Sequence, residues 1–155
     1  MSSVNLPTAR EIKSGWEFRG LRDSTLFFRT AHLVLPPDSF LVLEEESMAK
    51  DVREFVEAND AAALARLSPG TLWPRSRMHW IAAGPRTLAG LAGLSSHHAE
   101  PEICSHLYGV HVGRIILDWH DAFDGPLVVS SALSPEALAD FGCAVGIQPK
   151  PWQLS

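Results

Sequence analysis

The chain has 155 residues, a formal net charge of −5 and 46% hydrophobic residues. This length suits a single domain, and the composition is that of a globular protein and excludes a largely disordered one. Nowhere do three basic residues follow one another. We therefore expect no nucleic-acid binding, which depends on Lys and Arg neutralising phosphates.

The N-terminal segment lacks the apolar core of a secretory signal, and no stretch approaches the roughly 18 to 20 apolar residues that cross a bilayer. The two cysteines, Cys104 and Cys143, do not form a CxxC pair. We therefore expect a cytoplasmic protein with reduced thiols and no membrane association.

The N-terminal part of the chain predicts an arm and three strands. Residues 1–15 are polar, and we expect a flexible arm there, ahead of a single α+β domain over residues 16–155. A short strand is predicted at 16–19. Residues 25–35 are apolar on both alternating faces, which is typical of a central strand covered on both sides. Two prolines interrupt this strand, and residues 40–44 are predicted to return beside it as a hairpin.

Two helices are expected next. Hydrophobic residues recur at helical spacing from Met48 to Val56, with charged residues on the other side, and Ser47 stands where the helix would be capped. A shorter helix is predicted over residues 61–67, before a Ser-Pro-Gly sequence that ends it.

The remaining segments alternate between strand and helix. Strands are predicted at 77–83 and 127–130, and a helix at 86–94, where small residues between leucines would allow close packing. The last helix has Ser134 as its cap and Gly146 near its end. Together the elements predict one α+β domain with a mostly antiparallel sheet of five to seven strands and helices mainly on one face.

A histidine-rich stretch is the strongest candidate for chemistry. Five of the seven histidines fall within residues 97–120. Residues 113–114 fit a two-residue type II′ turn, whose first central position favours glycine. Pairing outward from that turn gives one apolar face and one face that carries His111, Asp118 and His120. A shift of one residue would instead turn these three side chains toward the core.

The His111, Asp118 and His120 group has three interpretations. Two imidazoles and a carboxylate could hold a divalent metal such as zinc, manganese or iron. Asp118 could instead orient one histidine as a general acid or base. The group could also be part of the solvent-exposed face of an amphipathic hairpin, where polar residues are expected without any functional role.

The loop before the hairpin offers two further alternatives. His97 or His98 could join Cys104 and His106 in a closed zinc site, although the usual paired spacing is missing. Cys104 could also be a nucleophile activated by His106 or His111, which would require a lowered thiol pKa.

Binding to a protein partner is the other functional class that the sequence indicates. Glu44, Glu45 and Glu46 are the densest run of negative charge and suit a basic partner, or else form a solvated strand end. Trp73 lies in a predicted loop, where tryptophan often anchors an interface. We predict a small acidic protein that binds another protein, as an inhibitor, immunity or adaptor protein does, without a cofactor. The alternative is an enzyme that uses the histidine-rich hairpin.

Overall fold

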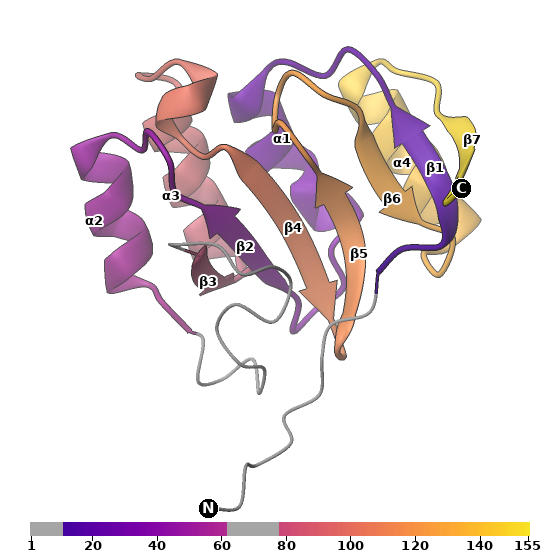
Figure 1. Ribbon diagram of the computed structural model, residues 1–155, viewed down its shortest axis with the longest axis horizontal. Helices are drawn as coiled ribbons and strands as arrows, with labels where there is room; N and C mark the ends of the chain where they lie inside the picture. Colours follow the sequence, from indigo (N-terminus) through magenta and orange to yellow (C-terminus); the bar gives the residue numbers. More distant parts are fainter. Residues whose placement is uncertain (1–10, 62–77) are drawn as a thin grey trace, which may run out of the picture.

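The computed structural model describes residues 11–61 and 78–155, which form a seven-stranded sheet with helices packed on it (Figure 1). The strands are β1 (Ser14–Phe18), β2 (Phe40–Glu44), β3 (Met78–Ala82), β4 (His106–His111), β5 (Arg114–Trp119), β6 (Leu127–Ser130) and β7 (Lys150–Gln153). The helices are α1 (Ser24–Thr30), α2 (Lys50–Ala58), α3 (Pro85–Ser95) and α4 (Pro135–Val145), with short 3₁₀ helices η1 (Ala31–Leu33) and η2 (Glu100–Glu102).

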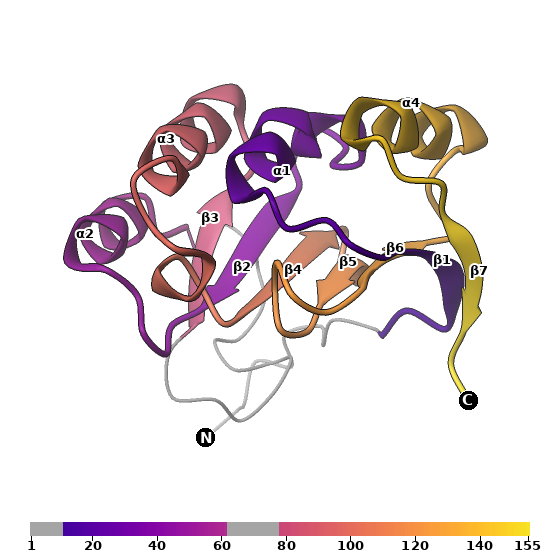
Figure 2. The same cartoon turned by 90° about the horizontal axis from the view of Figure 1, so that it is seen from above.

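The sheet order is β3-β2-β4-β5-β6-β1-β7, and every neighbouring pair is antiparallel. Figure 2 shows α1, α3 and α4 on one side of the sheet, with α2 next to α3 at the β3 edge. The predicted class, one α+β domain with an antiparallel sheet and helices mainly on one face, is confirmed. Within the described ranges, no helix combines the length and apolarity that crossing a bilayer requires.

The two faces of the sheet carry separate hydrophobic clusters. The helix-covered face holds the larger one, in which the Phe27 ring lies 4.9 Å from the Trp119 ring. Because side chains alternate along a strand, the neighbouring residues point to the opposite face. The cluster on that opposite face consists of Ile12, Val42, Trp80, Tyr108, Val110, Ile115 and Val128.

The predicted central strand at residues 25–35 is wrong, because this segment forms α1 and η1. The Asp23 carboxylate accepts a hydrogen bond from the Leu26 backbone N–H at 3.0 Å and caps α1. An apolar run covered on most sides does not distinguish a buried strand from a short buried helix by its periodicity. The predicted hairpin is therefore also wrong, and β2 pairs with β3 and β4 instead.

The other helices follow the predicted signals closely. α2 begins after Ala49 rather than at Ser47, and buries Val52 and Val56 as its pattern predicts. α4 has both predicted ends, because the Ser134 hydroxyl accepts a hydrogen bond from the Ala137 N–H and Gly146 adopts φ 71°. Close packing of α3 is confirmed at one glycine: a β-carbon at Gly90 would overlap the Phe55 ring of α2.

The two edges of the sheet differ. At β3, an isolated bridge joins Asp60 to Ile81, while the predicted helix at 61–67 lies outside the described residues apart from its first position. At the other edge, β7 places Pro151 opposite Trp16, and the Leu154 N–H donates to the Lys13 carbonyl at 2.9 Å. The sequence did not predict β7.

The N-terminal boundary is earlier than expected. β1 begins at Ser14, two residues before the predicted strand, and Ile12 is already buried. Residues 1–10 of the predicted arm lie outside the described residues.

Candidate functional site

The turn of the β4–β5 hairpin lies one residue earlier than predicted. His111 pairs with Arg114, so that Val112 and Gly113 occupy the two central positions. Their φ angles are 49° and 71°, and two positive φ angles define a type I′ turn rather than type II′. The predicted register, which depended on a turn at residues 113–114, is therefore wrong.

A β-bulge in β5 then decides which side chains face each side of the sheet. Val110 pairs with Ile115 but Gly109 pairs with Leu117, which leaves Ile116 as an extra residue. Ile116 and Leu117 consequently both join the cluster on the helix-covered face. Asp118 pairs with Tyr108 and points to the opposite face.

The predicted grouping of His111, Asp118 and His120 does not form as a group of three. His111 lies at the turn, beside Arg114, whereas His120 follows the far end of β5. Asp118 and His120 do share one face, two residues apart. Instead of His111, the histidine near His120 is His106, at the start of β4.

The His106 and His120 rings are stacked in parallel, with centroids 4.0 Å apart and planes inclined by 9°. Together with Asp121 they form a group whose potential ligand atoms all lie within 4.8 Å of one another. His106 is buried, while His120 and Asp121 are exposed. Among the residues that the structure describes, this is the group whose spacing resembles a metal site.

The hydrogen bonding of His106 does not fit metal ligation. The Asp121 backbone N–H donates to His106 Nδ1 at 2.8 Å. A backbone N–H can only donate, so Nδ1 must carry the lone pair and Nε2 the ring proton. A neutral imidazole in this tautomer has no second lone pair for a metal. A metal ion could bind His106 only if this hydrogen bond were broken.

Asp118, close to His120, has a raised pKa. Burial raises the pKa of the Asp118 carboxyl, the nearby His120 lowers it, and Glu11 raises it further. The net effect is an increase, so Asp118 holds its proton more strongly than an ordinary aspartate. An exposed imidazole close to such a carboxyl could exchange protons with a bound molecule.

The acidic run is largely buried, contrary to the exposed surface that its sequence suggests. Glu44 and Glu45 are only 7% and 8% exposed, and of the three only Glu46 is exposed. The Glu45 carboxylate accepts from Arg53 Nε at 2.6 Å and lies 2.8 Å from His79 Nε2. Glu45 thus joins α2 to β3. Trp73, the other predicted contact, lies outside the described residues.

The structure does not support a zinc site or a nucleophilic cysteine in the loop before β4. Burial raises the pKa of the Cys104 thiol strongly, which keeps it protonated and opposes a nucleophilic role. His98 Nε2 lies 2.8 Å from the Asp51 carboxylate, and His97 is exposed. Within the described ranges, no metal-type group contains Cys104.

The hairpin tip carries a feature that the sequence did not predict. Val112 is 83% exposed, the more exposed of the two large hydrophobic side chains that stand out on the described part of the chain; Leu154, at 50%, is the other. Val112 also has a positive φ, which a β-branched residue rarely adopts. Its signal in the sequence is the Val-Gly pair, which fits a type I′ turn only if valine accepts this conformation.

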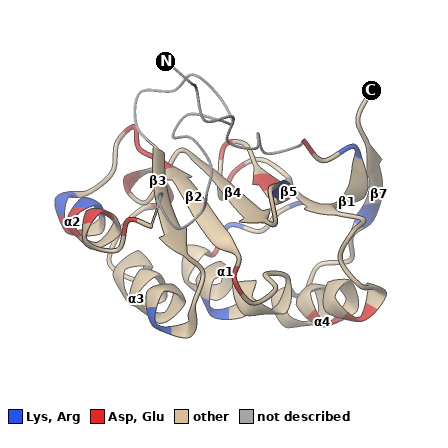
Figure 3. Ribbon diagram, turned by 90° about the horizontal axis from the view of Figure 1, so that it is seen from below, with Lys and Arg blue, Asp and Glu red and all other residues tan. Residues whose placement is uncertain are grey.

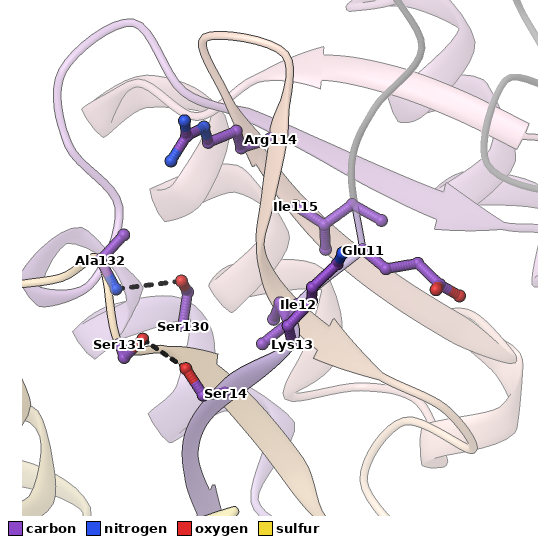
Figure 4. Close-up of a pocket in the computed structure, with 9 residues that line it drawn as sticks. All are labelled: Glu11, Ile12, Lys13, Ser14, Arg114, Ile115, Ser130, Ser131 and Ala132. Carbon is purple, nitrogen blue, oxygen red and sulfur yellow. Dashed lines mark hydrogen bonds between the residues drawn. The ribbon is translucent and has the colours of Figure 1, made fainter. Parts of the chain in front are cut away.

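Beside the tip is an open hollow of about 400 Å³ (Figure 4). It lies where the β5–β6 ladder ends, because these strands pair only at Leu117–Val129 and Asp118–Val128. The start of β5, the end of β6 and the residues leading into β1 line it.

No family model, curated protein or solved structure matches the chain. The geometry of the β4–β5 hairpin gives two candidate functional features. One is the pair of stacked histidines at one end, and the other is the strained tip with its neighbouring hollow at the opposite end. Figure 3 shows Lys and Arg residues on several separate segments of the described ribbon.

Proposed function

We propose that the protein acts by binding another protein, in the manner of an inhibitor, immunity or adaptor protein, and that the β4–β5 hairpin tip makes the central contact. Its place would be the cytoplasm, where both cysteines, which are free, would remain reduced. The observation that carries this proposal is the conformation and exposure of Val112.

Val112 is unfavourable in two separate respects. A left-handed backbone costs an L-residue roughly 1–2 kcal/mol, and asparagine, aspartate or glycine would fit a type I′ turn better. Burial does not offset this cost, because the side chain is 83% exposed. Strained residues that local packing does not explain are concentrated at functional positions. A partner that covers Val112 would supply the missing burial.

The chemistry around the tip suits an interface. Val112 stands between His111, which is half-buried, and Arg114, which is exposed. A projecting apolar side chain with polar neighbours is the usual arrangement of an interface centre and its rim. The net charge of −5 favours a partner that is basic overall.

The test compares capture by the wild-type protein with capture by Val112→Asn. Each protein is immobilised, exposed to lysate of its native host, and the bound proteins are quantified by mass spectrometry. We expect one protein to be enriched by the wild type and reduced at least tenfold with Val112→Asn. Leu154→Asn is the matched control, since Leu154 is the other exposed large hydrophobic residue, and it should leave capture unchanged.

The proposal fails if Val112→Asn, shown to be folded by circular dichroism, captures the same proteins in the same amounts as the wild type. It also fails if Leu154→Asn reduces capture equally, because the contact would then be non-specific hydrophobic adhesion.

The second candidate function is acid–base catalysis, which the stacking of His106 and His120 near Asp118 favours over a metal-dependent reaction. His120 would be the exchanging group, because it is the exposed ring of the pair. A panel of ester, phosphoester and peptide substrates should reveal an activity that His120→Gln removes and that the exposed His32→Gln control retains. If His120→Gln retains any activity found, catalysis does not use this cluster.

A further inference from the structure

We infer that the hollow beside Val112 receives an acidic side chain from a segment of the partner protein. This inference rests on the proposed function and specifies the chemistry that the tip recognises. The segment would place an apolar residue against Val112 and a carboxylate in the hollow.

Two cationic side chains line the hollow. Lys13 and Arg114 both line it and are both exposed. Among the residues that the structure describes, neither forms an ion pair, whereas Arg19 and Arg53 each do. Glu11 also lines the hollow, but Figure 4 shows its carboxylate directed away from Arg114 and the serines. The wall is therefore locally positive on an acidic protein.

Three serine hydroxyls at the hollow leave two hydrogen-bond donors free. Ser130 Oγ accepts from the Ala132 N–H at 3.1 Å, which leaves its own proton available. Ser14 Oγ and Ser131 Oγ lie 2.9 Å apart, so one donates to the other and the acceptor keeps a free proton. The two hydroxyl donors suit the acceptor atoms of a carboxylate, which cannot itself donate, and Lys13 and Arg114 add positive charge to the lining.

The position of the hollow indicates a protein segment as the source of the carboxylate. Arg114 lines the hollow and follows Val112 by only two residues, so a chain that contacts the tip lies near the Arg114 side of the hollow. Ile12 and Ile115, both buried, form an apolar part of the wall. A short segment that alternates apolar and acidic residues fits both surfaces at once, whereas a small anion would use only the charged part.

The test uses a defined peptide probe and nuclear magnetic resonance. The full-length protein is titrated with acetyl-Leu-Glu-Leu-Glu-amide, with the matching peptide that has glutamine in place of glutamate, and with inorganic phosphate. We expect the acidic peptide to shift the amide signals of Val112, Arg114 and Ser131, and the glutamine peptide to leave them unchanged. Arg114→Gln should weaken binding about two- to fivefold, the range for an exposed ion pair. Arg86→Gln, which removes an exposed cation on α3, should not weaken it.

Three results would overturn the inference: equal shifts with both peptides, shifts with phosphate but not with the acidic peptide, or equal affinity in Arg114→Gln and the wild type. The capture experiment separates this failure from failure of the proposed function. Loss of the partner with Val112→Asn but full retention with Arg114→Gln would leave the binding function standing and reject the acidic contact. Retention with both variants would reject the function itself.

Discussion

At the scale of single residues, the conformation of Val112 predicts an inverse relation between stability and binding. Val112→Asn replaces a β-branched residue at φ 49° by one that tolerates this region. We expect the free energy of unfolding to rise by about 1 kcal/mol, which corresponds to roughly 2–4 °C in Tm for a chain of this size. Thermal unfolding followed by circular dichroism measures the change. An unchanged or lower Tm would show that the turn is not strained.

Asp118 predicts a specific dependence of stability on pH. Because burial raises its pKa in the folded state, the folded protein binds its proton more strongly than the unfolded chain does. The contribution of this proton binding to stability is therefore complete below the ordinary aspartate pKa of 3.8. It is lost as the pH rises through the higher folded-state pKa. Asp118→Asn should be more stable than the wild type at pH 7, with a difference that vanishes below about pH 3.8.

Urea unfolding at a series of pH values checks this prediction. Asp124→Asn is the control, since the Asp124 side chain is 83% exposed, and its profile should follow that of the wild type. A stability difference for Asp118→Asn that does not change with pH would contradict the assigned cause.

His98 should titrate above its ordinary value. The hydrogen bond to Asp51 is the largest cause that raises the pKa of His98 above 6.5, and the charges of Asp51 and Glu102 add to it. Its contribution to stability is therefore full below about pH 6.5 and falls as the pH rises through the raised value. Nuclear magnetic resonance titration of the ring should show a lower pKa in Asp51→Asn and no change in Glu54→Gln. The same pKa in all three proteins would disprove the Asp51 contact.

The candidate site was predictable only in part from its residues. Asp118 lies beyond the bulge of β5, so the alternation of side chains places it on the same face as His120, which directly follows the strand. His111 was misplaced, since glycine at position 113 suits a type II′ turn as well as the second position of a type I′ turn. His106 was missed because the bulge at Ile116, which alters the register, leaves no mark in the composition.

At the scale of elements, α3 offers a matched comparison between two glycines. A β-carbon at Gly93 would meet open space, whereas one at Gly90 would overlap the Phe55 ring. Gly93→Ala should stabilise the protein by up to about 1 kcal/mol through helix propensity. Gly90→Ala should gain less, or lose stability, because the ring must move. Chemical denaturation of both variants tests this, and equal gains would show that Phe55 does not depend on Gly90.

Element types were predictable wherever the ends of an element carry their own signals. α4 has a serine cap, a proline at its first position and a glycine after its last turn, and both ends were predicted. Residues 25–35 have such a signal at one end only, the Asp23 cap, and aspartate is equally common in turns. β7 was missed for the opposite reason: its four residues, half of them polar, gain their strand geometry from β1.

At the scale of the whole molecule, the sheet order predicts a gradient of local stability. β2 and β4 have strands on both sides and almost fully buried side chains, whereas β7 has one neighbour and mainly exposed ones. Amide hydrogen exchange should therefore be slowest in β2 and β4 and fastest in β7. Equal protection of β7 and β4 would mean that the sheet opens only as a unit.

The edge formed by β7 affects whether the sheets of two copies of the protein can pair edge to edge. The Leu154 N–H bonds to the Lys13 carbonyl, and since inward and outward backbone groups alternate, Pro151 is directed outward. Proline has no N–H, so the outer row lacks a donor at its centre. A second sheet docking there would leave a carbonyl unmatched, and this edge therefore resists growth into fibres.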